Sequence, residues 1–132
     1  MIEEMITKAR EAMQNAYNPY SKYYVGACLR SEDDELFAGC NVENVSYGLT
    51  ICAESAALVA LITAGRRKIK EMVVMGSGNT LCTPCGACRQ RLAEFAISPE
   101  MPVHLCDQEQ VHKTVTIQEL LPYSFNVKHL EK

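Results

Sequence analysis

The sequence has no apolar stretch long enough to cross a membrane, and it has no excess of positive charge. Its 132 residues include 13 Lys and Arg against 16 Asp and Glu, a formal net charge of −3. The densest basic stretch, GRRKIK at 65–70, is short and is best explained as a solvated helix end. We therefore expect neither a membrane-spanning protein nor a protein that binds polynucleotides.

The N-terminal pattern of a secretory signal peptide is also missing. Residues 1–17 carry two acidic residues in the first four positions and no continuous apolar run. The cysteines number seven, so a disulfide framework cannot use them all. We therefore expect a reducing, cytoplasmic location, where clustered cysteines indicate a metal site or catalysis.

The sequence contains no internal repeat, low-complexity segment or linker, and we expect one domain over residues 1–132. The apolar periodicity and the capping residues predict helices at 2–16, 52–65 (closed by Gly65) and 85–96 (opened by Pro84). Strands are expected at 23–30, 35–41, 71–76, 101–106 and 112–117. The acidic turn SEDD predicts a hairpin, and the strand–helix alternation after it predicts an α/β fold with a mixed sheet covered by helices.

Three cysteines in two distant segments stand at predicted helix starts. Cys85 and Cys88 are three residues apart, which places both sulfurs on one helix face. Cys52 begins another helix. Helix N-termini carry partial positive charge and free N–H groups, which favour the thiolates that bind metals. Three thiolates could therefore meet at one zinc ion.

The cysteine spacing alone leaves two kinds of zinc site open. Cys82 could join the other three in a closed, structural four-cysteine site. Two features favour an open catalytic site instead. Pro84 separates Cys82 from the helix that Cys85 begins, and Glu54 follows Cys52 by two residues. An open site with a bound water needs a general base, whereas a structural site does not.

Five segments form a pattern that spans almost the whole chain: PYSKYYVGA (19–27), GCNVEN (39–44), CAE (52–54), PCGACRQ (84–90) and ELLPYSF (119–125). In this order and spacing they resemble the zinc-dependent cytidine deaminases, in their small, homotetrameric, three-cysteine branch. Three cysteines, a glutamate that is not a ligand, and a P-C-x-x-C element are general features of zinc deaminases. The resemblance implies a three-layer α/β/α fold with a mixed five-stranded sheet, one Zn²⁺ per chain, and a homotetramer with shared active sites.

The resemblance also implies what the metal site does. Cys52, Cys85 and Cys88 would hold zinc, and water would take its fourth position. Glu54 would be the catalytic residue, acting first as a base and later as an acid. The implied activity is hydrolytic deamination of free cytidine or deoxycytidine to uridine or deoxyuridine and ammonia, a reaction of pyrimidine salvage.

Further residues match the substrate contacts of the family. Asn41 and Glu43 match its ribose-binding residues, and their spacing at a strand end lets both point to one face. Tyr23 stands where the family usually has Phe and would pack on the pyrimidine. Ala53 would offer backbone groups to the base, and Phe125 would reach a neighbouring subunit's site.

Two other functions stay open. A deaminase of a modified cytosine nucleoside such as blasticidin S would share the zinc frame, although Asn41-Val42-Glu43 fits free cytidine or deoxycytidine better. A non-catalytic, zinc-stabilised oligomer would require Glu54 to be idle. An absorbance assay with the candidate nucleosides, with and without a chelator, separates these possibilities.

Ser55 departs from the resemblance. In the family an Arg usually follows the catalytic glutamate and offsets the charge of the zinc-bound thiolates. Ser55 can donate only one neutral hydrogen bond, and Arg89 occupies its usual place in PCGACRQ. The sequence therefore predicts a site that lacks this positive charge, with a less acidic zinc-bound water and more tolerance of a cationic substrate.

Overall fold

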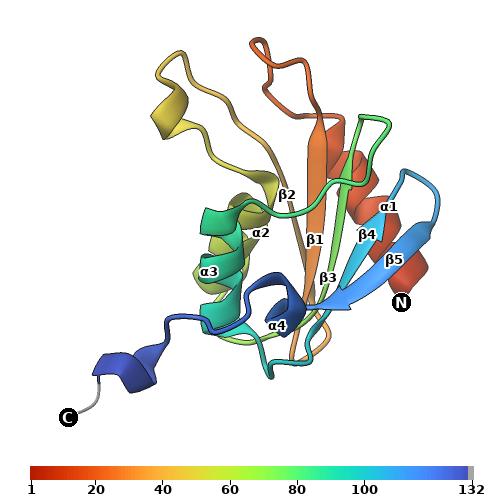
Figure 1. Ribbon diagram of the computed structural model, residues 1–132. Coiled ribbons are helices and arrows are strands. Elements are labelled where there is room, and N and C mark those ends of the chain that lie inside the picture. The colour runs from red at the N-terminus through yellow and green to blue at the C-terminus, as the bar shows by residue number, and fades with distance from the viewer. Residues whose placement is uncertain (131–132) are drawn as a thin grey trace.

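A mixed five-stranded sheet lies at the centre of the protein, as the computed structural model shows for residues 1–130 (Figure 1). The strands are β1 (Val25–Ser31), β2 (Leu36–Cys40), β3 (Ile69–Gly76), β4 (Pro102–Cys106) and β5 (Val111–Thr116). Their order across the sheet is β2-β1-β3-β4-β5. The β3–β4 pair is parallel, and the other three pairs are antiparallel. The predicted strands therefore agree with the observed ones to within two residues at each end.

Helices cover both faces of this sheet. They are α1 (Ile2–Met13), α2 (Ala53–Thr63), α3 (Gly86–Phe95) and the short α4 (Ile117–Leu120), with 3-10 turns η1 (Tyr47–Leu49) and η2 (Val127–Leu130). The apolar side of α1 packs on one face, and α2 and α3 lie side by side on the other (Figure 1). The predicted three-layer α/β/α fold is confirmed. No helix within residues 1–130 has the length and apolar character needed to span a membrane.

The first helix is shorter than predicted. The sequence pattern extends it to residue 16, but α1 ends at Met13. The backbone N–H of Tyr17 donates to the carbonyl oxygen of Asn41 at 3.0 Å, and Tyr17 forms a bridge with Val42. This pairing gives the backbone of Tyr17 partners outside the helix, whereas the N–H groups of residues 14–16 bond back to the end of α1 in a turn.

The two helices on the site side of the sheet begin at cysteines. Cys52 is the N-cap of α2 and Cys85 is the N-cap of α3, and both have extended backbone angles. Pro84 therefore lies one residue before the N-cap of α3, whereas the sequence pattern predicts it at the start of the helix. The chain after α2 turns at Gly65, whose φ of +91° favours glycine.

Close packing against β2 determines where α2 begins. A Cβ atom on Gly39 would lie 2.5 Å from the backbone nitrogen of Ala57 and 2.7 Å from the carbonyl oxygen of Ala53. Only glycine lets the backbone of the helix approach the strand so closely. This contact holds the N-terminal turn of α2, and with it Glu54, against the sheet.

Candidate active site

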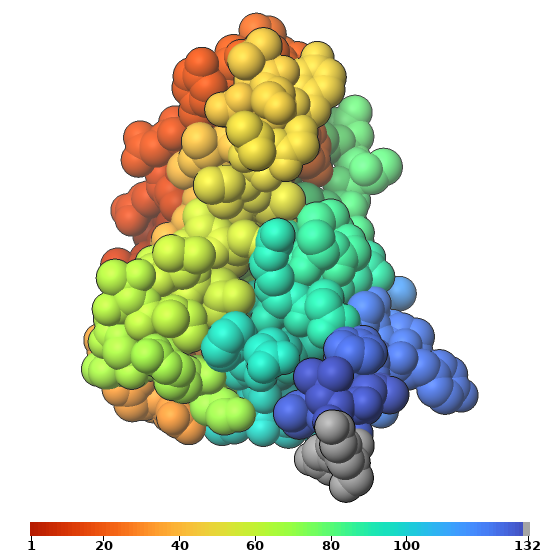
Figure 2. Space-filling view, turned by 90° about the vertical axis from the view of Figure 1, so that its left-hand side faces the viewer, coloured from red at the N-terminus to blue at the C-terminus, as the bar shows by residue number. Residues whose placement is uncertain are grey.

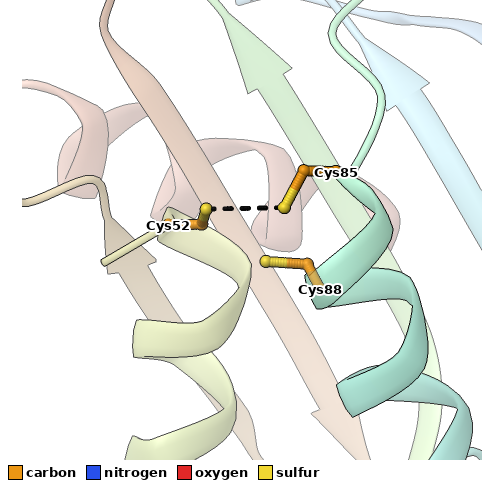
Figure 3. A group of neighbouring side chains, drawn as sticks. All are labelled: Cys52, Cys85 and Cys88. Carbon is orange, nitrogen blue, oxygen red and sulfur yellow. Dashed lines mark hydrogen bonds between the residues drawn. The ribbon is translucent and has the colours of Figure 1, made fainter. Parts of the chain in front are cut away.

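Three cysteine sulfurs converge where the N-termini of α2 and α3 meet (Figure 3). Cys52 and Cys85 are the N-caps of the two helices, and Cys88 lies in the first turn of α3. The three sulfur atoms all lie within 4.8 Å of one another, and the Sγ atoms of Cys52 and Cys85 are 3.7 Å apart. All three thiols are free of disulfides. Helix capping thus brings together residues that are 33 positions apart.

The three sulfurs fit a zinc ion. Tetrahedral zinc with Zn–S distances of about 2.3 Å places its sulfur ligands roughly 3.8 Å apart. The Cys52–Cys85 distance matches this value. Within residues 1–130, the group that could hold a metal consists of these three cysteines, and Cys82 is not part of it. Three protein ligands leave one coordination position open, as in catalytic zinc sites.

Negative charge gathers on Cys88. Hydrogen bonds lower the pKa of this thiol to about 5, the largest effect coming from Cys52, with Ser55 and Cys85 adding to it. The hydrogen bond with Cys88 and burial raise the pKa of Cys52. Cys88 is fully buried. Its thiolate therefore depends on neighbouring donors, not on water, for stabilisation.

Glu54 lies beside this thiolate. Its side chain is buried, with 3% of the residue surface exposed. Burial is the main reason that the pKa of Glu54 is raised to about 7, and the negative charge of Cys88 is the second. Glu54 comes two residues after the cap of α2, where the chain has only just become helical. A carboxyl group in this environment can both accept and donate a proton near neutral pH.

Tyr23 and Cys82 lie against each other near Glu54. Burial raises the pKa of the Tyr23 phenol to about 12, and a hydrogen bond with Cys82 and the charge of Glu54 add to the effect. The Tyr23 ring packs on Gly76 and Gly78, where an added Cβ would clash with it. Cys82 thus contacts the aromatic residue and does not join the three sulfurs.

Asn41 and Glu43 hold the loop that carries Tyr23. The Asn41 side chain donates to the Tyr23 carbonyl oxygen at 2.8 Å and accepts from the Val25 N–H at 3.0 Å. Glu43 accepts from the backbone N–H groups of Tyr20 and Ser21 at 3.1 Å each. A hydrogen bond from the Ser21 hydroxyl is the main cause of the lowered pKa of Glu43. Both residues therefore connect the end of β2 with the loop before β1.

Ala53 and Phe125 lie in very different surroundings. Ala53 is fully buried, between Cys52 and Glu54 in the chain. Phe125 is 59% exposed and stacks on His129 with ring centroids 5.2 Å apart. Its carbonyl oxygen accepts a hydrogen bond from Gln90. The structure thus brings Ala53 to the cysteine group, whereas the contacts of Phe125 are with α3 and the C-terminal segment.

Arg91 is a site residue that the sequence analysis missed. Ser55 lies with its Oγ 3.2 Å from the Cys88 Sγ, and Arg91 Nη1 donates to the same Oγ at 2.9 Å. The expectation of a site without a nearby positive charge is therefore corrected, because a guanidinium reaches Ser55. The less acidic zinc-bound water and the tolerance of a cationic substrate stay predictions. Arg91 follows Cys88 by three residues, a spacing that places both on one helix face and could have revealed it. Arg89 instead donates to the carbonyl oxygens of Pro84 and Leu120.

A three-layer α/β/α fold with an open three-thiol centre and a buried carboxylate defines a zinc-dependent hydrolase of the deaminase class. Residues 1–103 match the family described as the cytidine and deoxycytidylate deaminase zinc-binding region. The chain belongs to this family, whose zinc the three cysteines can hold.

Several relatives are similar to this chain over nearly its whole length. A cytidine deaminase of Sporosarcina psychrophila is 39% identical over 129 residues, covering 98% of this chain and 94% of the relative. One from Mycobacterium tuberculosis is 36% identical, covering 94% and 89%. A crystal structure of cytidine deaminase from Burkholderia pseudomallei superposes with a TM-score of 0.87 at 38% identity, covering 95% of this chain and 99% of that one.

Proposed function

We propose that this protein catalyses the hydrolytic deamination of free cytidine and deoxycytidine, releasing uridine or deoxyuridine and ammonia. The observation that carries the proposal is the convergence of three thiols within 4.8 Å beside the buried Glu54. The similarity to cytidine deaminases over 98% of the chain supports the choice of substrate. Residues 1–132 form one catalytic domain in this proposal, and the reaction serves pyrimidine salvage in the cytoplasm.

In this proposal the three cysteines bind the metal, and Glu54 accepts and donates protons. When bound by Cys52, Cys85 and Cys88, zinc supplies Lewis-acid chemistry that makes water a nucleophile at neutral pH. The Glu54 carboxylate takes the proton of the attacking water. It gives this proton to N3 of the pyrimidine, then takes the second proton from the hydroxyl group now on C4 and delivers it to the departing amine as the C4–N bond breaks. One carboxyl group serves all these transfers because it accepts two protons and donates two, and so regains its starting charge by the end of the cycle.

The remaining site residues orient the nucleoside. The Tyr23 ring, fixed by Gly76 and Gly78, packs on the pyrimidine. Asn41 and Glu43 bind the ribose hydroxyl groups while holding the loop that carries Tyr23. The backbone of Ala53 contacts the edge of the base. The same residues thus order the loop and would orient the bound substrate for reaction.

An absorbance assay with cytidine, deoxycytidine and blasticidin S tests the proposal. We expect both simple nucleosides to be deaminated, blasticidin S to react poorly, and a zinc chelator to remove the activity. Faster turnover of blasticidin S would transfer the function to a modified cytosine nucleoside. A zinc-loaded protein that converts none of the three compounds would support the non-catalytic oligomer.

A homotetramer with shared active sites is part of this proposal. The segment around η1, which projects from the sheet in Figure 1, exposes large apolar side chains: Val45, Tyr47, Leu49 and Ile51. The C-terminal segment exposes others: Tyr123, Phe125, Val127 and Leu130. On the face shown in Figure 2, the yellow-green surface of α2 meets the teal surface of α3. Exposed apolar side chains that lie close together mark interaction surfaces, and association with further copies of the chain would cover them.

Replacing Phe125 with Ala tests the shared site. We expect KM for cytidine to rise about 10-fold, because losing an aromatic contact in a ligand site costs on the order of 1.4 kcal/mol. Steady-state kinetics give KM, and light scattering gives the oligomeric state of the wild type. A fully active monomer at assay concentration would exclude a site shared between subunits.

A further inference from the structure

A chain of two hydrogen bonds leads from Arg91 to the most buried of the three thiols. Arg91 Nη1 lies 2.9 Å from Ser55 Oγ, and Ser55 Oγ lies 3.2 Å from Cys88 Sγ. We propose that Arg91 is a positioning residue that stabilises the Cys88 thiolate through the Ser55 hydroxyl and thereby sets how tightly zinc is held. The inference rests on the proposed function only in taking Cys88 as a zinc ligand.

The chemistry of the three groups determines which atom donates in each of the two hydrogen bonds. A guanidinium can only donate hydrogen bonds, so the contact with Arg91 uses a lone pair of Ser55 Oγ. A thiolate bound to metal can only accept, so the single hydroxyl proton of Ser55 points to Cys88. Each bond polarises the next, and the positive charge of Arg91 strengthens the donation to sulfur. The backbone N–H of Ser55 also hydrogen-bonds Cys88.

The surroundings favour charge compensation through this relay, the two hydrogen bonds that join Arg91, Ser55 and Cys88. Three thiolates on a divalent cation leave one excess negative charge. Ser55 is only 7% exposed, so its hydroxyl depends on protein partners and not on bulk water. The guanidinium group of an arginine carries a positive charge in proteins. Through the Ser55 hydroxyl, this positive charge therefore acts on the sulfur of the buried Cys88.

Packing offers a competing explanation for the position of Arg91. The side chain also lines an apolar groove between α2 and α3, together with Leu58, Val59, Ile62, Glu94 and Phe95. An arginine held there by its aliphatic stem would contribute to helix packing alone. In that case zinc affinity would not depend on the guanidinium, whereas in the relay it does. The two explanations are separated by measuring metal binding directly.

The test measures the zinc dissociation constant by competition with a chromogenic chelator, on the full-length protein. We expect Arg91→Gln and Ser55→Ala each to weaken zinc binding by about 10-fold, the lower end for groups that orient metal ligands. The double variant should bind zinc no more weakly than the worse of the two single variants, because both changes interrupt the same pair of hydrogen bonds. Arg67→Gln removes the same charge from an exposed residue away from the site and should leave the affinity within about 2-fold of wild type.

A spectroscopic measurement keeps the test independent of deamination. In the cobalt-substituted protein, we expect the thiolate-to-cobalt charge-transfer band to shift in Ser55→Ala and Arg91→Gln but not in Arg67→Gln. Arg91→Lys, which keeps the charge, should retain more zinc affinity than Arg91→Gln and serves if the latter folds poorly. Wild-type affinity in Arg91→Gln, or fully additive losses in the double variant, would overturn the proposal. A wild-type protein that binds zinc but does not deaminate cytidine would contradict the proposed function, and the zinc-affinity measurement would still test the relay.

Discussion

Glu54→Gln is expected to retain zinc and to lose at least ~10²-fold in kcat for cytidine, the lower end for general acid–base catalysis. The amide keeps the size and shape of the buried side chain, so the fold and the three thiols should be undisturbed. It cannot take a proton from water or deliver one to the pyrimidine. The measurement combines the initial rate of the absorbance change with zinc analysis of the same sample.

The control for this variant is Glu11→Gln, which removes a carboxylate from the exposed side of α1. It should have wild-type kcat and zinc content. Near-normal turnover in a zinc-loaded Glu54→Gln protein would remove the proposed proton transfers. Loss of zinc from that variant would instead show that Glu54 supports the metal centre.

Cys88→Ser is expected to lose both zinc and activity, whereas Cys82→Ser should keep about one zinc per chain and most of its activity. Cys88 is fully buried and supplies one of three sulfurs within 4.8 Å of one another. Serine is a poor ligand for zinc in place of a thiolate, and two remaining thiols cannot hold the ion tightly. Cys82 contacts Tyr23 instead, so its replacement should change KM more than metal content.

Zinc per chain, measured by atomic absorption after gel filtration, distinguishes the two kinds of site. A Cys82→Ser protein that purified without zinc would revive the closed four-cysteine site, despite the position of Cys82 outside the group. A Cys88→Ser protein with one zinc per chain would remove Cys88 from the ligand set. The two variants differ from wild type by the same atom, a sulfur exchanged for oxygen, and are therefore matched controls for each other.

Much of the fold and the candidate site follows from local sequence patterns. Short strand-like and apolar runs beside turn residues predict each strand to within two residues, because these are local signals of strand formation. The likeness of the motifs around Cys52, Cys85 and Glu54 to those of known deaminases points to the same site. Cysteines at two helix starts suggest a metal because a helix N-terminus favours thiolates wherever it occurs.

Other features come from contacts between segments far apart in the chain. Helix α1 ends at Met13, short of the predicted residue 16, and Tyr17 pairs with Asn41 and Val42 instead, a contact that no local pattern encodes. Asn41 and Glu43 bond the loop before β1, a use of their side chains that their spacing did not indicate.

Ser55 illustrates the division most clearly. The sequence by itself determined that a small neutral residue follows Glu54 and that this position departs from the family pattern. Only the tertiary structure decided which group lies beside it, by packing α3 against α2 so that Arg91 reaches the Ser55 hydroxyl. The physical reason is that hydrogen bonds form between atoms a few ångströms apart in space, whatever their separation of 36 residues along the chain.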